Sequence, residues 1–445
     1  EDISKPVKPA ARPTRVRYIV LGLLALAASS AYLTRHCLGV MNTTMQEELE
    51  INNQQFGYLY SAFSLGYLLF QVPGGWLGQK FGTRIIMPGL STVWSLCTVV
   101  TAAVSSLATM IAARFVFGLA QAGLVPNSAK VVKDWFPVAV RGKASSVCAM
   151  AMSLGGIITV TLTAWLMAEG HGWRSILNGY SLVGIAWAVA FYFIFRTRPV
   201  EHAWTNQAEQ QIIREGDEDA DDNNEPPKMN WGAAFRERNT WALCGQLIFK
   251  AAGYNFFVTF FPAFLEYKYG IAKTDAGMLT TYPLIGVVLG SLCGGMVIDG
   301  LFNKTGSKYM SRCVVAATAL GLTAVFAFGS TFTGSAQQLA TVIAIGSFFS
   351  GMAMPCPWAA SIDMGGKNPA LVMGMMNSAG CLAGICISPY VGKLIDHIKA
   401  INGNWDIVVY VHAAFYLLAA LLWLVVNPNK NIGHSAEAAE AKGDV

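Results

Sequence analysis

Three basic residues lie deep inside long apolar stretches of the sequence: Arg35, Arg114 and Lys250. No aspartate or glutamate lies in the middle of such a stretch, so these cations have no partner of opposite charge at their own depth. An unpaired charge in a medium of low dielectric constant is strongly unfavourable. An anionic ligand would remove this penalty, because a guanidinium binds a carboxylate or phosphate through two parallel hydrogen bonds and an ammonium attracts it as a point charge. The three residues therefore predict an anion-binding site.

The alternative for each cation is that its side chain reaches toward the membrane surface or bonds to helix carbonyls. This alternative carries most weight for Arg114, which lies in the outer half of its apolar stretch, and less for Arg35 and Lys250. We therefore interpret Arg35 as the main anion anchor, with Arg114 and Lys250 raising the local positive potential.

Polar and aromatic residues accompany these cations. Tyr32 precedes Arg35 by three positions and Gln121 follows Arg114 by two helical turns, so each pair can face one cavity. Taken alone, such residues more often serve packing or hydrogen bonds between helices. His36 can titrate near neutral pH and is a candidate for coupling transport to protons, although a core histidine with satisfied hydrogen bonds is the simpler reading.

The elements that must position these residues are membrane-spanning helices. The chain of 445 residues is 54% hydrophobic and only 13% charged, where soluble proteins carry about 25% charged residues. Apolar windows of about 18 residues or more cover most of the sequence and each predicts a spanning helix. We expect twelve spans, at residues 17–41, 54–78, 85–105, 107–133, 144–168, 174–196, 240–265, 276–301, 311–331, 336–360, 370–394 and 405–427.

Lysine and arginine gather in alternate loops and in the N-terminal tail, which by the positive-inside rule places both termini in the cytoplasm. The predicted parts are a basic tail (1–16), a first bundle of six helices (17–196), a polar and acidic linker (197–239), a second bundle of six (240–427) and a C-terminal tail (428–445).

Short motifs recur in the two halves, as in Gln121-Ala-Gly-Leu-Val-Pro126 and Ser350-Gly-Met-Ala-Met-Pro355. Two related bundles that meet at a midplane site are typical of secondary transporters.

At this level of detail the sequence resembles the anion:cation symporter family of the major facilitator superfamily, which includes bacterial sugar-acid transporters, sialin and the vesicular glutamate transporters. The resemblance covers nearly the whole chain outside the tails and linker. Its motifs are the segment Tyr32–Val40, Ser61-Ala-Phe, Tyr67, Gln71-Val-Pro-Gly-Gly-Trp76, Arg114 with Gly118 and Pro126, Trp135-Phe-Pro137 with Arg141, Phe257–Pro262, Asp363-Met-Gly-Gly-Lys367, Gly374-Met-Met-Asn377, and Ser388-Pro389 with Gly392 and Asp396.

The resemblance implies an all-α major facilitator fold in a cell membrane, with the bacterial inner membrane as the expected location. It also implies that Arg35 binds the substrate carboxylate, that Tyr32, Tyr67, Trp358 and Asn377 line the site, and that Lys250 stands where the vesicular glutamate transporters place a basic residue. The expected substrate-binding set is Tyr32, Arg35, Tyr67, Arg114, Gln121, Lys250, Trp358 and Asn377. Asp299 and Arg84 are expected to act at the cytoplasmic gate.

Four departures from the family pattern affect the mechanism. The proton-coupled sugar-acid members carry carboxylates at the positions of Thr34 and Gln121, and a hydroxyl and an amide do not titrate in the working range. Met152 replaces a glutamine that contacts substrate, and Gln79 replaces a gate aspartate. We therefore expect transport that does not depend on a proton gradient, running as exchange or uniport or with another coupling ion.

The sequence thus predicts a secondary transporter of small organic anions such as sugar acids, working by alternating access as a functional monomer in a lipid bilayer. An organophosphate/phosphate exchanger would fit the same positive charge, and a membrane anion sensor without transport is an alternative of another class. Motifs typical of enzymes, including HExxH, a nucleophile elbow and an embedded pair of carboxylates, do not occur. We expect no cofactor, metal or nucleic-acid partner.

Overall fold

The computed structural model describes residues 12–215, 230–259, 261–401 and 403–433, and in these the regular structure is helical. Ten helical segments are long and apolar enough to cross a membrane. The predicted spans 54–78 and 240–265 also coincide with helices, which are long enough to cross but less apolar. The first half contains α1 (Val16–Leu49), α2 (Asn53–Phe81), α3 (Thr83–Ala103), α4 (Leu107–Ala122), α5 (Leu124–Trp135), α6 (Arg141–Ala168) and α7 (Trp173–Ile194).

The second half repeats this plan. Its helices are α10 (Arg238–Thr259), α11 (Phe261–Tyr269), α12 (Lys273–Thr305), α13 (Val315–Gly329), α14 (Ala336–Met352), α15 (Pro355–Gly365), α16 (Pro369–Leu382), α17 (Ser388–Ala400) and α18 (Asp406–Val425), with π-helical turns η3 (Tyr309–Val314) and η5 (Ala383–Ile387). In the first half α1 packs on α6, α2 on α4 and α3 on α7. In the second half the corresponding pairs are α10 with α16, α12 with α14 and α13 with α18.

Glycines allow the closest of these pairs to form. A Cβ atom at Gly66 of α2 would overlap the carbonyl oxygen of Phe115 in α4, and one at Gly118 of α4 would overlap that of Phe63 in α2. In the equivalent pair, α12 and α14, Gly290 allows the same close approach, since it lies against the carbonyl oxygen of Phe348. Small residues of this kind let helix backbones approach closely inside a membrane.

Two of the predicted spans are interrupted at equivalent places. The span 107–133 consists of α4 and α5, which meet at Gly123, and the span 336–360 consists of α14 and α15, which meet at residues 353–354. Both breaks fall within the repeated motif that ends in Pro126 and Pro355. A proline removes one intrahelical hydrogen bond and crowds the preceding turn, so the repeated prolines account for the repeated breaks.

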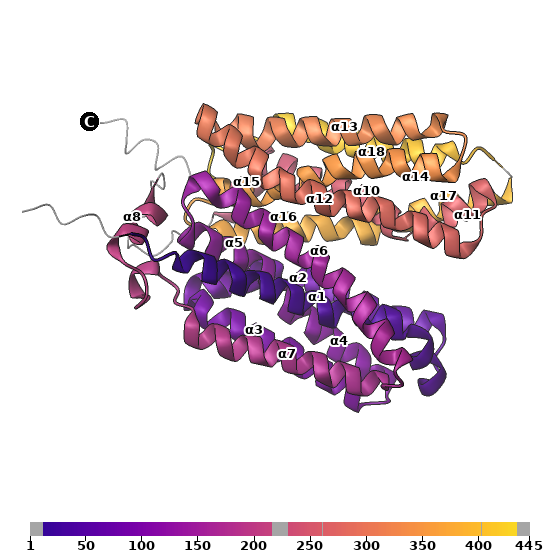
Figure 1. Cartoon of the computed structure of the whole chain (residues 1–445), viewed down its shortest axis with the longest axis horizontal. Coiled ribbons are helices and arrows are strands. Elements are labelled where there is room, and N and C mark those ends of the chain that lie inside the picture. Colours follow the sequence, from indigo (N-terminus) through magenta and orange to yellow (C-terminus); the bar gives the residue numbers. More distant parts are fainter. Residues whose placement is uncertain (1–11, 216–229, 260, 402, 434–445) are drawn as a thin grey trace, which may run out of the picture.

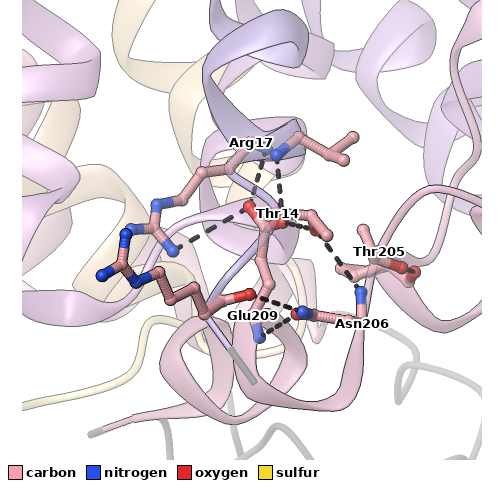
Figure 2. A network of polar contacts seen from close by, with 8 residues as sticks. Thr14, Arg17, Thr205, Asn206 and Glu209 are labelled. Carbon is pink, nitrogen blue, oxygen red and sulfur yellow. Dashed lines mark hydrogen bonds and ion pairs between the residues drawn. The ribbon is translucent and has the colours of Figure 1, made fainter. Parts of the chain in front are cut away.

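The linker contains two short helices, α8 (Gln207–Arg214) and α9 (Trp231–Arg236), whereas most of its acidic run lies outside the described residues. The backbone N–H groups of Val16 and Arg17, at the start of α1, donate to the Glu209 carboxylate at 3.0 and 3.1 Å. The Thr14 hydroxyl also donates to this carboxylate, which is fully buried (Figure 2). The first part of the linker is therefore fixed to the first half.

The two halves meet at one end of the molecule, which we call the linker end because the linker and both described chain ends lie there (Figure 1). At this end α2 and α5 pack on α16, while α6 packs on α12 and α15. The α2 residues found in these contacts lie between Tyr67 and Gln79, in the second half of that helix. Toward the opposite end the two bundles diverge (Figure 1).

Candidate functional site

Arg35 lies on α1 inside a ring of aromatic side chains. Its guanidinium carbon is 4.8 Å from the ring centroid of Tyr32, 5.0 Å from that of Phe63 and 4.7 Å from that of Tyr67. Tyr32 comes from the preceding turn of α1, and the other two rings come from α2. Among the described residues no carboxylate forms an ion pair with Arg35. Aromatic faces attract the cation without neutralising it, so the guanidinium keeps its capacity to bind an anion.

One edge of the guanidinium is held by α4. The Arg35 Nε–H donates to Gln121 Oε1 at 3.0 Å. The Gln121 amide nitrogen donates to the Ala31 carbonyl at 2.9 Å and to the Thr34 hydroxyl at 3.2 Å, and Thr34 in turn donates to the Ala31 carbonyl at 3.1 Å. Gln121 and Thr34 are both fully buried. The two positions that depart from the family pattern therefore belong to one neutral hydrogen-bond network around the anchor.

A polar junction joins the two halves beside this anchor. Asn377 of α16 donates from Nδ2 to the Gln71 side-chain oxygen and to the Tyr67 hydroxyl, the latter at 3.4 Å. Gln71 also donates to Cys381 Sγ at 3.4 Å, and Ser378 Oγ donates to the Leu68 carbonyl at 3.2 Å. The structure thus brings two predicted residues, Tyr67 and Asn377, into contact across the interface.

Phe63 and Gln71 complete this face of α2 but were not predicted as site residues. They lie four residues before and four residues after Tyr67, so all three share one side of the helix. This spacing is the signal that could have identified them from the sequence.

Lys250 lies on α10 of the second half, with 8% of its surface exposed and with no acidic partner among the described residues. Leu247, one turn earlier on α10, packs against Gly380 of α16, a residue one turn beyond Asn377. Arg35 on α1 and Lys250 on α10 therefore come from different halves, which meet nearby through Asn377 of α16. Trp358, on α15, is 8% exposed and packs in the core of this half.

Arg114 lies two helical turns before Gln121 on α4 and does not join the Arg35 network. It is 3% exposed, its guanidinium carbon is 4.7 Å from the Phe117 ring, and its Nε and Nη2 atoms are buried without a hydrogen-bond partner. The Arg114 side chain therefore does not extend to the surface of the protein, which was the alternative for this residue.

His36 is exposed on α1, next to Arg35, and its ring centroid is 5.1 Å from that of Tyr32.

The predicted gate residues occupy different places. Asp299 of α12 is fully buried and accepts hydrogen bonds from the backbone N–H groups of Gly142 and Lys143 at 2.9 and 2.7 Å, at the start of α6. A carboxylate at a helix N-terminus is favoured by the helix dipole, and this one joins the two halves. Arg84 instead donates from Nε to the Tyr192 carbonyl at 3.2 Å, a contact within the first half.

Gln79 lies at the position equivalent to Asp299. Its side-chain nitrogen is 3.4 Å from the carbonyl oxygen of Lys367, in the loop between α15 and α16. The contact crosses between the halves as that of Asp299 does, but it carries no charge. At these two equivalent positions the linker end therefore has one charged and one neutral contact between the halves.

The chain matches the family model of the Major Facilitator Superfamily over residues 24–384 and, in a second match, over residues 243–444. It is 28% identical to a probable sulfoacetate transporter of Cupriavidus necator, over 96% of this chain and 97% of that protein. It is also 28% identical to a probable galactarate/D-glucarate transporter of Bacillus subtilis, over 96% and 95% of the two chains. A D-galactonate transporter of Escherichia coli O6:H1 is 28% identical, over 95% and 99%.

Solved structures share the fold at low sequence identity. The proton:xylose symporter XylE bound to 6-bromo-6-deoxy-D-glucose superposes with a TM-score of 0.72 at 14% identity, covering 95% of this chain and 98% of that one. The fucose:proton symporter FucP in its outward conformation gives a TM-score of 0.64 at 14% identity, over 92% and 99% of the chains.

Proposed function

Because the chain belongs to the Major Facilitator Superfamily, we propose that its aromatic-caged Arg35 is the anchor on which a small organic acid is carried across a bacterial inner membrane. The chain is a secondary transporter of organic acids and not an enzyme, as the names of its relatives indicate. The single observation that carries the assignment to Arg35 is a guanidinium held by Gln121 and three aromatic rings with no carboxylate partner among the described residues.

Alternating access accounts for the arrangement of the two halves. The linker end is the cytoplasmic end in this proposal, since the basic loops and both chain ends lie on one side. Contacts close this end while the bundles diverge toward the other, which corresponds to an outward-facing state. Rocking of the halves about the polar junction at Asn377 would then expose Arg35 to the cytoplasm. No part of this scheme requires a second copy of the chain.

The test of the anchor is counterflow uptake in proteoliposomes. Arg35→Ala removes the charge and should abolish binding, with a loss of more than about 30-fold in apparent affinity, since truncating one partner of a buried charge pair costs about 2–5 kcal/mol. Arg35→Lys keeps the charge but loses the two-pronged geometry, so transport should fall sharply. Arg196→Ala serves as the matched control, because that arginine bonds to the backbone carbonyls of Phe193 and Phe195 and belongs neither to the site nor to the predicted gate. Near wild-type uptake by a well-folded Arg35→Ala protein would remove Arg35 from this role.

The position of Lys250 indicates which organic acids are preferred. Arg35 and Lys250 come from different halves and have no acidic partner among the described residues, and a substrate with an acidic group at each end would engage both charges. Sulfoacetate, galactarate and D-glucarate, named for two of the relatives, each carry two acidic groups, whereas D-galactonate carries one. We therefore place doubly charged acids first and the sugar-phosphate alternative behind them.

Counterflow measured with the Lys250→Gln variant should distinguish substrates that carry two acidic groups from those that carry one. The variant should weaken counterflow of sulfoacetate and D-glucarate by about tenfold, the effect of about 1.4 kcal/mol, and should leave D-galactonate close to its wild-type affinity. Lys250→Arg keeps the charge and should retain the preference. An equal loss for one-acid and two-acid substrates would mean that Lys250 supports the fold or the general potential, and stimulation by inorganic phosphate on the opposite side would favour the phosphate exchanger.

A further inference from the structure

The short segment that follows α18 reaches back to the loop that closes the cytoplasmic gate. We define this gate loop as the last two residues of α15 (364–365) and residues 366–368 before α16. It accepts two hydrogen bonds from the first half: Lys133 donates from Nζ to the Gly366 carbonyl, and Gln79 donates to the Lys367 carbonyl. From the opposite side the backbone N–H of Ile432 donates to the Met364 carbonyl at 2.9 Å. Three carbonyls of the gate loop thus accept from three residues that are far apart in the sequence, two in the first half and one after α18.

The segment is firmly held in its own half. The Ile432 side chain is fully buried in the main hydrophobic core. Asn427 and Asn239 exchange a pair of hydrogen bonds, with Asn239 Nδ2 donating to the Asn427 carbonyl at 2.9 Å and the Asn427 N–H donating to Asn239 Oδ1 at 2.7 Å. Gly433 accepts from the backbone N–H of Asn230 at 3.1 Å. These contacts tie residues 427–433 to the start of α10 and to the end of the linker.

The gate loop has a conformation that depends on support. Gly366 has a φ of +51°, in the left-handed region that favours glycine, and the Asn431 side chain lies against it. In this conformation the Gly366 carbonyl accepts from Lys133 of the other half. Without this support the loop would sample other conformations more easily, because local opening is cheapest where few contacts hold the backbone.

We propose that residues 427–433 form a strap that positions the gate loop for closure of the cytoplasmic end, with Ile432 and Asn239 as its positioning residues. The strap lies in the second half only, so it sets the shape of one gate surface and leaves the substrate-binding residues untouched. Loosening it should favour states in which the cytoplasmic end is open. This proposal concerns the gate and does not depend on which organic acid is carried.

The test uses full-length protein in lipid nanodiscs with Ile432→Ala and Asn239→Ala. Hydrogen exchange of backbone amides in residues 364–372 should accelerate at least about threefold in both variants, since local opening becomes easier. Spin labels at the exposed residues Phe81 and Met310, on the two halves at the linker end, should show a larger population of long distances. Ile401→Ala is the matched control, since Ile401 is 60% exposed and should change neither measurement.

The distance measurement separates positioning from general loss of stability. A merely structural role would accelerate exchange throughout the second half and leave the distance distribution unchanged, and that result would overturn the proposal. Unchanged exchange in residues 364–372 would do the same. If Ile432→Ala fails to fold, Ile432→Val removes one methylene and should give a smaller shift of the same sign, whereas no shift in that variant and in Asn239→Ala would contradict the strap.

Discussion

At the scale of single residues, the anchor is surrounded by groups that cannot titrate. Gln121 accepts from Arg35 and donates to Thr34, and both Gln121 and Thr34 donate to the Ala31 carbonyl. An amide and a hydroxyl do not titrate in the working range, so neither carries a proton that transport could release. Embedded carboxylates are the usual proton carriers in transporters. We therefore propose that the anion is carried without need of a proton gradient, as exchange or uniport or with another ion.

Gln121→Glu should make transport depend on pH. Its carboxylate would lie about 3.0 Å from Arg35 Nε and would compete with the substrate for the guanidinium. The anion would bind only when this carboxyl is protonated, so uptake should rise as the pH falls in the variant and should change little in the wild type. The measurement is uptake into proteoliposomes with an imposed pH gradient, with and without a membrane potential.

Gln55→Glu is the control for this experiment, because Gln55 belongs to the capping box at the start of α2, away from the anchor. Concentrative uptake driven by the pH gradient alone in the wild type would contradict proton independence. In that case, loss of this uptake in His36→Gln would show that the exposed histidine beside the anchor carries the proton.

Helical spacing accounts for what the sequence could predict about the site. It places Tyr32 with Arg35, and the motifs indicated Tyr67 and Asn377, which the structure joins across the interface. Spacing within one helix cannot say which other helix a residue faces. For that reason the sequence grouped Arg114 with Arg35, although in the structure Arg35 bonds to Gln121, two helical turns further along α4, and Arg114 lies against Phe117.

At the scale of elements, the sequence located the spans but not the folded parts of the linker. Apolar windows are long and continuous, so their positions follow directly from composition. Contacts of the linker depend on residues nearly 200 positions apart, such as Glu209 and Val16, and local pattern carries no signal for them. His202 is such a case: it is 5% exposed, and its ring centroid lies 5.7 Å from that of Trp135 at the end of α5.

His202 should make the stability of this packing depend on pH. Burial lowers the pKa of His202 below its ordinary value, and Arg196 lowers it further, whereas a hydrogen bond to the Ile194 backbone and the charge of Glu209 act in the opposite direction. The folded state binds fewer protons than the unfolded state, so the contribution is full above the ordinary pKa of about 6.5 and is lost as the pH falls through the lowered value. Protonation would also remove the acceptor that Nδ1 offers to the Trp204 N–H at 3.2 Å.

The check is the melting temperature measured from about pH 7 to about pH 5, the range in which histidine changes charge. The decline toward acid should be steeper in the wild type than in His202→Phe, which keeps an aromatic ring beside Trp135 but cannot be protonated. His171→Gln, at an exposed histidine, should follow the wild type. Identical slopes for wild type and His202→Phe would show that other groups govern the acid sensitivity.

At the scale of the whole molecule, closure of the linker end depends on contacts of unequal strength. Asp299 caps the first turn of α6 from the other half, while the equivalent Gln79 offers only a neutral hydrogen bond. A partly buried charge at a helix terminus contributes about 1–2 kcal/mol. The outward-facing state should therefore depend more on the α6–α12 side than on the α2–α16 side.

Asp299→Asn should shift the population toward inward-facing molecules by about tenfold, the equivalent of roughly 1.4 kcal/mol. Pulsed electron resonance distances between labels at Phe81 and Met310 measure this shift. Asp275→Asn, at an exposed position in the first turn of the same helix, is the control and should leave the distances unchanged. Gln79→Ala removes only the neutral hydrogen bond to the Lys367 carbonyl and should give a much smaller shift, and a shift as large as that of Asp299→Asn would contradict the unequal strength of the two contacts.

The hydrogen bond from Arg35 Nε to Gln121 also has a geometric consequence for selectivity. With Nε engaged, the guanidinium offers its terminal edge, formed by Nη1 and Nη2, so an acid group must approach along the long axis of the side chain. The rest of the ligand then extends away from Arg35 in one direction. In the proposed two-charge site, the length of the carbon chain then decides whether a second acid group reaches Lys250. Selectivity among organic acids would follow the distance between their two charged ends.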